Sequence, residues 1–283
     1  MDGDPPPREH IHIVAGPTAS GKTARAIELA TELDGEIISV DSRQVYKTLD
    51  IGTEKITRDE MQGIPHHLID IREPEEQYSA GDFVEDASGR ITDIVSRGKT
   101  PILAGGTNFY FDALLYGLPS GERNDVLRNE LEKLSSEELF ARVKDADPRR
   151  ASRIDPQNKR RLIRALELIA EHGLVPERIQ GAPRYEVTWH VINPERDVLR
   201  ARIRKRLIET LDKGLIEEVH RTRERVGDER LNELGLEYKI VGEYLRGERA
   251  EDTLIPTLSS KLWHYARHQK QWLRRLMENV ASR

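Results

Sequence analysis

The sequence predicts an α/β fold in which helices flank a parallel sheet and an all-helical domain is inserted into the chain. Three observations support this. Residues 1–117 alternate short apolar runs with amphipathic helical patterns, which is typical of βαβ units. A glycine-rich turn follows the first apolar run. Residues 118–183 then carry no convincing strand before an apolar run returns at 185–193, which we expect to rejoin the sheet.

Each expected strand is a short apolar run bounded by polar or glycine residues. The strands are expected at 11–16, 36–41, 66–71, 100–106 and 185–193. In the helix expected over 22–33, Ile27, Ala30 and Leu33 lie on one face, and Ser79 is the expected N-cap of a helix over 79–98. Further helices are expected at 108–116, 125–134, 136–145, 158–172, 196–226, 232–245 and 252–280.

These elements predict three parts of the chain. Residues 1–10 form a disordered lead, 11–117 and 184–283 form the α/β core with its C-terminal helices, and 118–183 form the helical insertion domain. No apolar run approaches the roughly 20 residues that a bilayer span needs. The N-terminus also lacks the apolar segment of a signal peptide, so we expect a cytoplasmic protein that does not contact a membrane.

The composition limits the possible chemistry. The chain of 283 residues contains no cysteine, which excludes a disulfide framework and any cysteine-ligated zinc or iron–sulfur site. The formal net charge is −5, but basic residues cluster over 149–164 and 200–206. Because nucleic-acid binding depends on such local clusters, the overall charge does not exclude an RNA partner.

The segment GPTASGKT matches the P-loop pattern G-x-x-x-x-G-K-[ST] between a predicted strand and a predicted helix. Backbone N–H groups and the helix N-terminus surround phosphate oxygens in this motif, so a P-loop NTPase-like sheet is the expected core. Lys22 would supply a positive charge, and Thr23 a hydroxyl ligand for Mg²⁺. The expected di- or triphosphate-binding residues are Gly16, Pro17, Thr18, Ala19, Ser20, Gly21, Lys22 and Thr23.

Asp41 ends the second predicted strand, at the sheet edge where the P-loop opens. Three roles fit this position: a Mg²⁺ ligand of Walker-B type, a general base, and a cap for the turn DSRQVY that follows. Position alone does not separate them. Thr107, in the turn GGT after the fourth strand, offers a hydroxyl at the same edge, where open α/β sheets bind ligands.

Other conspicuous residues favour structural roles. His66 and His67 are adjacent on a predicted strand, so one is expected to be buried and the other exposed. Trp263, Tyr265 and Trp272 on the last helix are expected to pack in the core.

The segment RRLIRALELI combines an apolar stripe with arginines beside it. Leu162 and Ile163 belong to the stripe, while Arg160, Arg161 and Arg164 gather on the adjoining side of the helix. Guanidinium groups match phosphate oxygens with two parallel hydrogen bonds, so we expect this helix to bind phosphate groups.

Several segments together resemble the tRNA dimethylallyltransferase family, of the bacterial type. They are GPTASGKT at 16–23, DSRQVYK at 41–47, DIGTEK at 50–55, HHLIDI at 66–71, YSAGDF at 78–83, GGTNFYFDALLYGL at 105–118, RRLIRALE at 160–167 and GLIEEV at 214–219. The resemblance implies transfer of a dimethylallyl group from dimethylallyl diphosphate to N6 of adenine 37, beside the anticodon of tRNA. It also implies Mg²⁺ as cofactor and the tRNA anticodon stem-loop as partner, and we expect a monomer.

The resemblance also implies roles for individual residues. Asp41 is then the general base for the adenine amine, and Lys22, Thr23 and Arg206 are the further catalytic residues that act on the diphosphate. The implied tRNA-binding residues are Asp41, Ser42, Arg43, Gln44, Thr107, Arg128, Arg160, Arg161, Leu162, Ile163 and Arg164.

Two alternatives come from related chemistry. A P-loop small-molecule kinase shares the loop, an insertion and arginines, but it needs a lid arginine pair and a nucleobase pocket that are not evident here. An adenylate isopentenyltransferase, which prenylates free AMP, ADP or ATP, leaves the basic insertion nothing to bind. The last helix departs from the family pattern: Trp263 and His268 stand where relatives carry arginine, and Gln271 where they carry threonine.

Overall fold

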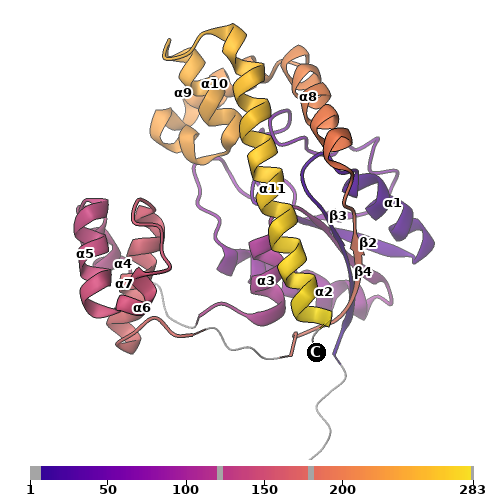
Figure 1. Ribbon diagram of the computed structural model, residues 1–283. Helices are drawn as coiled ribbons and strands as arrows, with labels where there is room; N and C mark the ends of the chain where they lie inside the picture. Colours follow the sequence, from indigo (N-terminus) through magenta and orange to yellow (C-terminus); the bar gives the residue numbers. More distant parts are fainter. Residues whose placement is uncertain (1–7, 120–123, 178–181, 282–283) are drawn as a thin grey trace, which may run out of the picture. The chain divides into compact units, whose positions relative to one another are not determined.

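The protein, seen in a computed structural model, is described over residues 8–119, 124–177 and 182–281 (Figure 1). It divides into two compact units, one combining Met1–Leu115 with Pro183–Arg283 and the other spanning Tyr116–Ala182. We call the first the α/β unit and the second the helical unit. Most of the expected disordered lead, 1–7, lies outside the described residues, and the first strand begins within its remainder, at His10.

A five-stranded sheet forms the α/β unit, with strand order β3-β2-β4-β1-β5 and every pairing parallel. The strands are β1 (His10–Ala15), β2 (Gly35–Val40), β3 (His66–His67), β4 (Thr100–Gly105) and β5 (Glu186–Val191). As predicted, the late strand β5 returns to the sheet, where it pairs with β1 along its full length. The third strand is shorter than predicted, because Leu68 and Asp70 have left-handed φ values of 61° and 55°.

Helices cover both faces of this sheet. Helix α1 (Lys22–Glu32) packs on apolar residues of β1, β2 and β4. The opposite face carries Trp189, which contacts Phe111 of α3 (Asn108–Tyr116), and Tyr110 of α3 in turn stacks on Phe83 of α2 (Ala80–Ser96). The carboxyl ends of the strands stay at the edge of this sandwich, where polar loops gather.

The prediction of a single helix over 196–226 is wrong. The structure has two helices instead, α8 (Arg196–Asp212) and α9 (Leu215–Glu233). Gly214, with φ 97°, takes the left-handed conformation that ends α8 and begins α9, and Gly227, with φ 75°, kinks α9. The remaining elements are α10 (Leu236–Leu245), the 3₁₀ turn η1 (Glu251–Thr253) and α11 (Leu254–Ala281). Helix α11 packs against both α8 and α10 (Figure 1). None of the helices described is long and apolar enough to cross a membrane.

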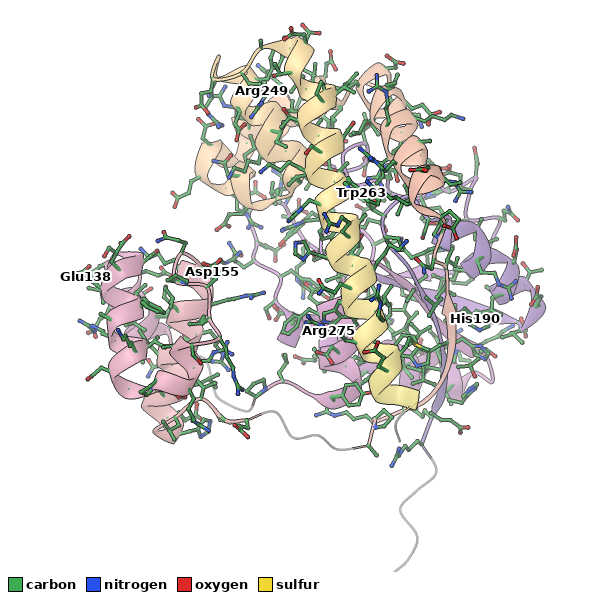
Figure 2. All side chains as sticks on the ribbon, viewed as in Figure 1. Glu138, Asp155, His190, Arg249, Trp263 and Arg275 are labelled. Carbon is green, nitrogen blue, oxygen red and sulfur yellow. The ribbon has the colours of Figure 1, made fainter. Side chains whose placement is uncertain are left out.

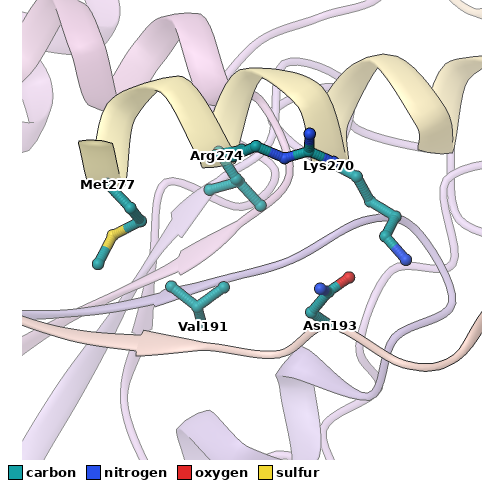
Figure 3. Close-up of a pocket in the computed structure, with 6 residues that line it drawn as sticks. Val191, Asn193, Lys270, Arg274 and Met277 are labelled. Atoms are coloured by element: carbon teal, nitrogen blue, oxygen red, sulfur yellow. The ribbon is translucent and has the colours of Figure 1, made fainter. Parts of the chain in front are cut away.

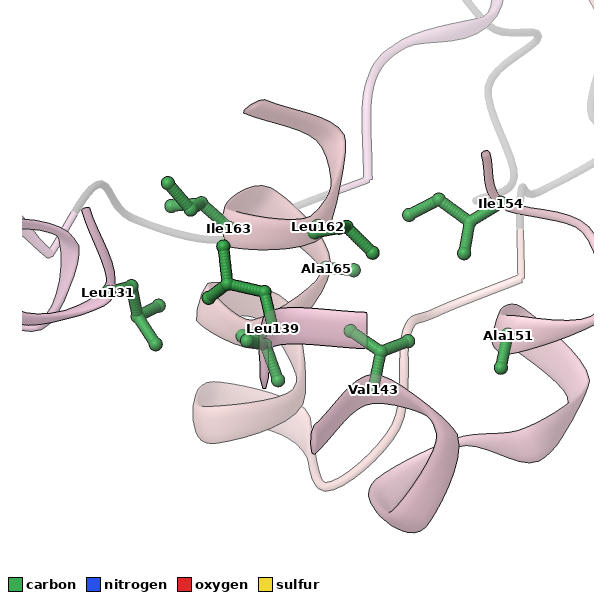
Figure 4. Close-up of a cluster of buried hydrophobic side chains, with 9 residues drawn as sticks. Leu131, Leu139, Val143, Ala151, Ile154, Leu162, Ile163 and Ala165 are labelled. Carbon is green, nitrogen blue, oxygen red and sulfur yellow. The ribbon is translucent and has the colours of Figure 1, made fainter. Parts of the chain in front are cut away.

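The helical unit has an apolar core of its own (Figure 4). It contains α4 (Asp125–Leu131), α5 (Ser136–Ala146), the short α6 (Pro148–Ala151), which the sequence did not predict, and α7 (Lys159–His172). Each of these helices begins with a side-chain cap, from Asn124, Ser135, Asp147 and Asn158 respectively. Leu139 and Leu162, both fully buried, join α5 to α7 in the centre of this core. The insertion expected from the sequence, 118–183, corresponds to this unit, which spans Tyr116–Ala182.

One buried carboxylate fixes the loop that follows β2. Glu218 of α9 is 3% exposed and accepts hydrogen bonds from the backbone N–H groups of Asp50, Ile51 and Gly52 at 2.8–2.9 Å. The Tyr238 hydroxyl donates to the same carboxylate at 2.7 Å. Four donors satisfy the buried charge, so the 50–52 loop is tied to the C-terminal helices.

Replacing this carboxylate tests the anchor. Glu218→Ala leaves three backbone N–H groups and the buried Tyr238 hydroxyl without their acceptor, so we expect it to lower the free energy of unfolding by about 4 kcal/mol. The matched control is Glu217→Ala, at an exposed neighbouring position, with an expected loss of about 0.5 kcal/mol. Urea denaturation measures both, and losses of equal size would contradict the anchoring role.

Candidate active site

The 16–23 loop joins β1 to α1 and has the backbone geometry of an anion site. Ala19 and Gly21 have left-handed φ values of 58° and 97°. A Cβ on Gly16 would lie 2.5 Å from the carbonyl oxygen of Ile192, so only glycine fits there. A left-handed turn that enters a helix N-terminus directs backbone N–H groups toward one point, which favours binding of an anion.

Lys22 begins α1, and its ammonium group donates to the Pro17 carbonyl oxygen at 2.7 Å. Burial lowers the pKa of Lys22 to about 8; the carboxylates of Asp41 and Glu54 oppose this shift, and Arg206 adds to it. An anion bound in the loop would favour the charged form of Lys22 and raise its pKa again.

Two arginines of α8 reach the same loop. Arg206 forms an ion pair with Glu54 and donates to the Thr18 hydroxyl, and its Nη2 lies 3.7 Å from the carboxylate of Glu237. Arg202 donates to a carbonyl oxygen of the loop at 3.0 Å. The structure therefore brings Arg206, predicted as a catalytic residue, to the predicted diphosphate loop.

Asp41 lies where β2 ends and caps the turn that follows. Its Oδ1 accepts from the N–H groups of Arg43 at 2.8 Å and Gln44 at 3.4 Å, so the capping role is present. From the end of β4, the Thr107 hydroxyl accepts from the Ser42 N–H at 3.1 Å. The residues predicted from the ends of β2 and β4 thus meet at one edge of the sheet.

Gln269, which sequence reasoning missed, links three parts of this edge. Its Oε1 accepts from the Thr18 N–H at 2.9 Å, its Nε2 donates to the Gly106 carbonyl oxygen at 2.8 Å, and its backbone carbonyl accepts from the Asn108 amide at 3.0 Å. A Cβ on Gly106 would lie 2.6 Å from Gln269 Nε2. The available signal was a glutamine within the apolar stripe of the last helix, between Leu262 and Leu273.

The sequence analysis also missed two glutamates at this edge. Glu54 lies in the loop after β2, and Glu237 lies in the first turn of α10. Burial raises the pKa of each carboxyl group, and the charge of Arg206 opposes the shift in both. Nothing in the local sequence distinguishes these glutamates from exposed ones, because their surroundings are created by tertiary packing.

The aromatic residues of α11 correct a prediction. Tyr265 is 45% exposed, so it is not a core residue. The partial burial of its ring, together with the charge of Asp41, raises its pKa to about 12. Trp263 is half-buried on the side of α11 that faces α8, with Arg196 and Arg200 at 5.8 and 5.5 Å from its ring (Figure 2). Cation–π contact, rather than core packing, explains its position.

The histidine pair also differs from prediction. His66 and His67 are both half-buried, since β3 lies at the edge of the sheet. His66 Nδ1 lies 2.8 Å from the Ile64 carbonyl oxygen, and His67 Nε2 lies 2.7 Å from the carboxylate of Glu36. Both rings are used in structural hydrogen bonds.

The donor set at the loop fits a magnesium ion that is shared with phosphate groups. Thr23 is exposed in the first turn of α1, so its hydroxyl is accessible beside the loop. Within the described part of the chain, no three His, Cys, Asp or Glu side chains cluster as a metal site. Mg²⁺ typically takes one or two protein oxygens together with substrate phosphates and water, so a single hydroxyl is compatible with it.

In the helical unit, a buried acid forms ion pairs with two of the predicted tRNA-binding arginines. Glu167 is 3% exposed and accepts from Arg128 Nε at 2.8 Å, Arg128 Nη2 at 3.0 Å and Arg164 Nη1 at 3.2 Å. Although burial acts in the opposite direction, these hydrogen bonds keep the pKa of Glu167 below its usual range. Arg160 and Arg161 lie at the beginning of the same helix, α7.

The burial of Leu162 and Ile163 does not support their predicted role as tRNA contacts. They are 0% and 4% exposed and belong to the core of the helical unit (Figure 4). A ligand on the surface cannot reach them, so within 160–164 any contact with phosphate falls to the arginines.

A small pocket lies apart from these residues, between the end of β5 and α11 (Figure 3). Its volume is about 180 Å³, and its lining contains none of the predicted site residues. The lining residues are Val191, Asn193, Lys270, Leu273, Arg274 and Met277.

The fold and the site define the class of protein. A parallel sheet flanked by helices carries a glycine-rich loop, two partly buried cations and an aspartate at the carboxyl ends of its strands. This is a P-loop-like α/β protein with its polar site at that edge.

Comparisons with known proteins identify the family. A family model described as IPP transferase matches residues 44–276. The chain is 39% identical over 280 residues to the tRNA dimethylallyltransferase of Oceanobacillus iheyensis, covering 95% of this chain and 90% of that protein. It is 40% identical over 280 residues to the tRNA dimethylallyltransferase of Thermomicrobium roseum, covering 96% and 85%. The chain therefore belongs to the IPP transferase family.

Solved structures agree. The full-length tRNA isopentenylpyrophosphate transferase of Bacillus halodurans superposes with a TM-score of 0.70 at 38% identity, covering 94% of this chain and 87% of that one. A eukaryotic dimethylallyltransferase acting on tRNA gives a TM-score of 0.83 at 26% identity, covering 96% and 72%.

The role of Gln269 as a link can be tested against a neighbour on α11. Gln269→Ala removes an acceptor from Thr18 and a donor from Gly106, so we expect it to lower the free energy of unfolding by about 2–3 kcal/mol. Hydrogen exchange of the Thr18 N–H should also accelerate. Gln271→Ala, at an exposed position, should change stability by about 0.5 kcal/mol or less. Similar effects of the two substitutions would show that Gln269 does not hold the loop.

Proposed function

We propose that this protein transfers a dimethylallyl group from dimethylallyl diphosphate to N6 of adenine 37, beside the anticodon of tRNA, and releases diphosphate. The observation that carries the proposal is that Arg206 of α8 reaches the 16–23 loop, which contains Lys22. The negative charge of Asp41 also acts on Lys22. Relatives across nearly the whole chain bear the name of this activity.

The cationic side of the site suits a diphosphate leaving group. Negative charge builds up on the bridging oxygen as the bond to the allylic carbon breaks. The loop N–H groups, Lys22 and Arg206 are fixed in place before the ligand arrives, and donors arranged in advance stabilise such charge without further reorganisation. Gly16 to Thr23 would surround the phosphate oxygens. When bound at Thr23, Mg²⁺ would neutralise part of the diphosphate charge.

Asp41 is the proposed general base. The adenine amine attacks the allylic carbon, a carbon–nitrogen bond forms as the carbon–oxygen bond breaks, and N6 then gives up a proton to the Asp41 carboxylate. The turn from Ser42 to Gln44 and the hydroxyl of Thr107 fix the position of this carboxylate. They are also the proposed contacts of the target nucleotide.

The anticodon arm is proposed to contact the arginines of the helical unit. Arg160 and Arg161 begin α7, and Arg128 and Arg164 lie in the same unit, where they share Glu167. Guanidinium groups suit phosphate oxygens because their donors match the oxygens in pairs. Such contacts make binding depend on salt concentration. A protein that modifies tRNA in this way would act in the cytoplasm, and we propose that it acts as a monomer.

An acceptor assay separates this function from its alternatives. The protein is incubated with Mg²⁺, labelled dimethylallyl diphosphate and either undermodified tRNA or AMP. We expect label in tRNA only. Label in AMP would indicate an adenylate isopentenyltransferase, and label in neither acceptor would contradict prenyl transfer, after which ATP-dependent phosphorylation by a small-molecule kinase is the reaction to examine.

The base can be removed while the cap is kept. In Asp41→Asn, the amide oxygen still accepts from Arg43 and Gln44, but the side chain no longer takes a proton. We expect transfer to fall by about 100-fold or more while diphosphate binding persists. The control is Asp34→Asn, at a side chain that is 80% exposed and paired with Lys99, which should leave both measurements unchanged. Lost diphosphate binding with only slightly reduced transfer would instead identify Asp41 as a metal ligand.

A further inference from the structure

Glu54 places a carboxylate inside the cationic site that the diphosphate would use. It forms an ion pair with Arg206 through Nε and contributes to the electrostatic surroundings of Lys22. The Glu54 side chain is 40% exposed, so it borders open space beside the loop, whereas the Arg206 side chain is 15% exposed. The protein therefore supplies its own anion to the arginine expected to bind the ligand.

The backbone around Glu54 is held in place, which keeps its carboxylate beside Arg206. Glu54 has a left-handed φ of 49°, which is unfavourable for a residue with a Cβ and persists only where surrounding contacts enforce it. The Gln44 amide donates to the Glu54 carbonyl oxygen at 3.3 Å. On one side Glu218 holds residues 50–52, and on the other Lys55 donates to the Tyr46 carbonyl oxygen at 2.7 Å. The backbone at Glu54 is fixed at both ends.

A bound diphosphate would therefore share Arg206 with Glu54. The Glu54 carboxylate lies against the Nε side of the Arg206 guanidinium as an ion pair, while Nη1 donates to the Thr18 hydroxyl. The Glu237 carboxylate lies 3.7 Å from Arg206 Nη2, and the charge of Asp41 acts on Lys22. Additional negative charge in this space repels the ligand and competes for the same cation.

We propose that Glu54 is a positioning residue that competes with diphosphate for Arg206, so that it weakens the hold on the product and speeds its release. This inference rests on the proposed prenyl transfer, in which diphosphate is the product. As the diphosphate leaves after transfer, the Glu54 carboxylate keeps Arg206 paired, which spares the largely buried guanidinium an unpaired state.

The competition should depend on pH. Burial raises the pKa of Glu54, and Arg206, Lys22 and Lys213 oppose the shift. Glu237, on α10, is the other carboxyl group of the cluster, and its pKa is raised too. The competitor is charged above its pKa and neutral below it. Its effect on diphosphate binding should therefore be larger above this raised pKa and shrink as the pH falls through it.

The test is titration calorimetry of inorganic pyrophosphate with Mg²⁺ on the wild-type protein and on Glu54→Gln, at pH 8 and pH 5.5. We expect the substitution to tighten pyrophosphate binding about fivefold at pH 8 and clearly less at pH 5.5. Product inhibition of transfer by pyrophosphate should strengthen by a similar factor. Glu237→Gln should act in the same direction with a smaller effect, and it serves as the second variant if Glu54→Gln proves unstable.

The control is Glu28→Gln, which removes the same charge at an exposed position on α1 that pairs with Arg25. It should leave pyrophosphate binding unchanged. Unchanged or weaker binding by Glu54→Gln, with wild-type binding and transfer intact, would overturn the competition and leave the proposed function standing. Failure of the wild-type protein to bind pyrophosphate would contradict the proposed function itself.

Discussion

The two side-chain hydrogen bonds of Gln269 are the constraint on which the site depends. They join Thr18 in the loop after β1 to Gly106 in the turn after β4, although Gln269 lies 251 and 163 residues from these partners in sequence. Through them α11 fixes the distance between the predicted diphosphate loop and the edge where Asp41 and Thr107 meet. A Cβ at position 106 would lie 2.6 Å from the Gln269 amide nitrogen, so a larger residue there would displace the amide.

The second constraint is charge balance within a small volume. Lys22 and Arg206 are cations that sit largely away from water, and the protein compensates them with Asp41, Glu54 and Glu237. Burying cations without partners would be strongly unfavourable, so the site is stable without ligand only because carboxylates are present. The helical unit repeats this arrangement, with Glu167 between Arg128 and Arg164. In both places an acid lies between cations that are proposed to bind phosphate groups.

The sequence predicted local features well and long-range contacts poorly. The P-loop motif, the cap at Ser79 and the return of β5 follow from short patterns, and the structure agrees with them. The break at Gly214 was missed because helical periodicity continues across it. Gln269 and Glu54 were missed for another reason: their roles depend on residues brought together only by folding. For Leu162 and Ile163 the apolar stripe predicted burial correctly, whereas the tRNA contact implied by the resemblance does not fit two buried side chains.

The central claim is that the 16–23 loop serves a diphosphate leaving group rather than a nucleoside triphosphate. The most direct test is a competition experiment in which dimethylallyl diphosphate and ATP bind the wild-type protein in the presence of Mg²⁺. Equilibrium dialysis with labelled ligands measures the binding of each. Our account predicts that dimethylallyl diphosphate binds and that excess ATP displaces it only weakly. Tight ATP binding that excludes dimethylallyl diphosphate at equal concentration would contradict the account.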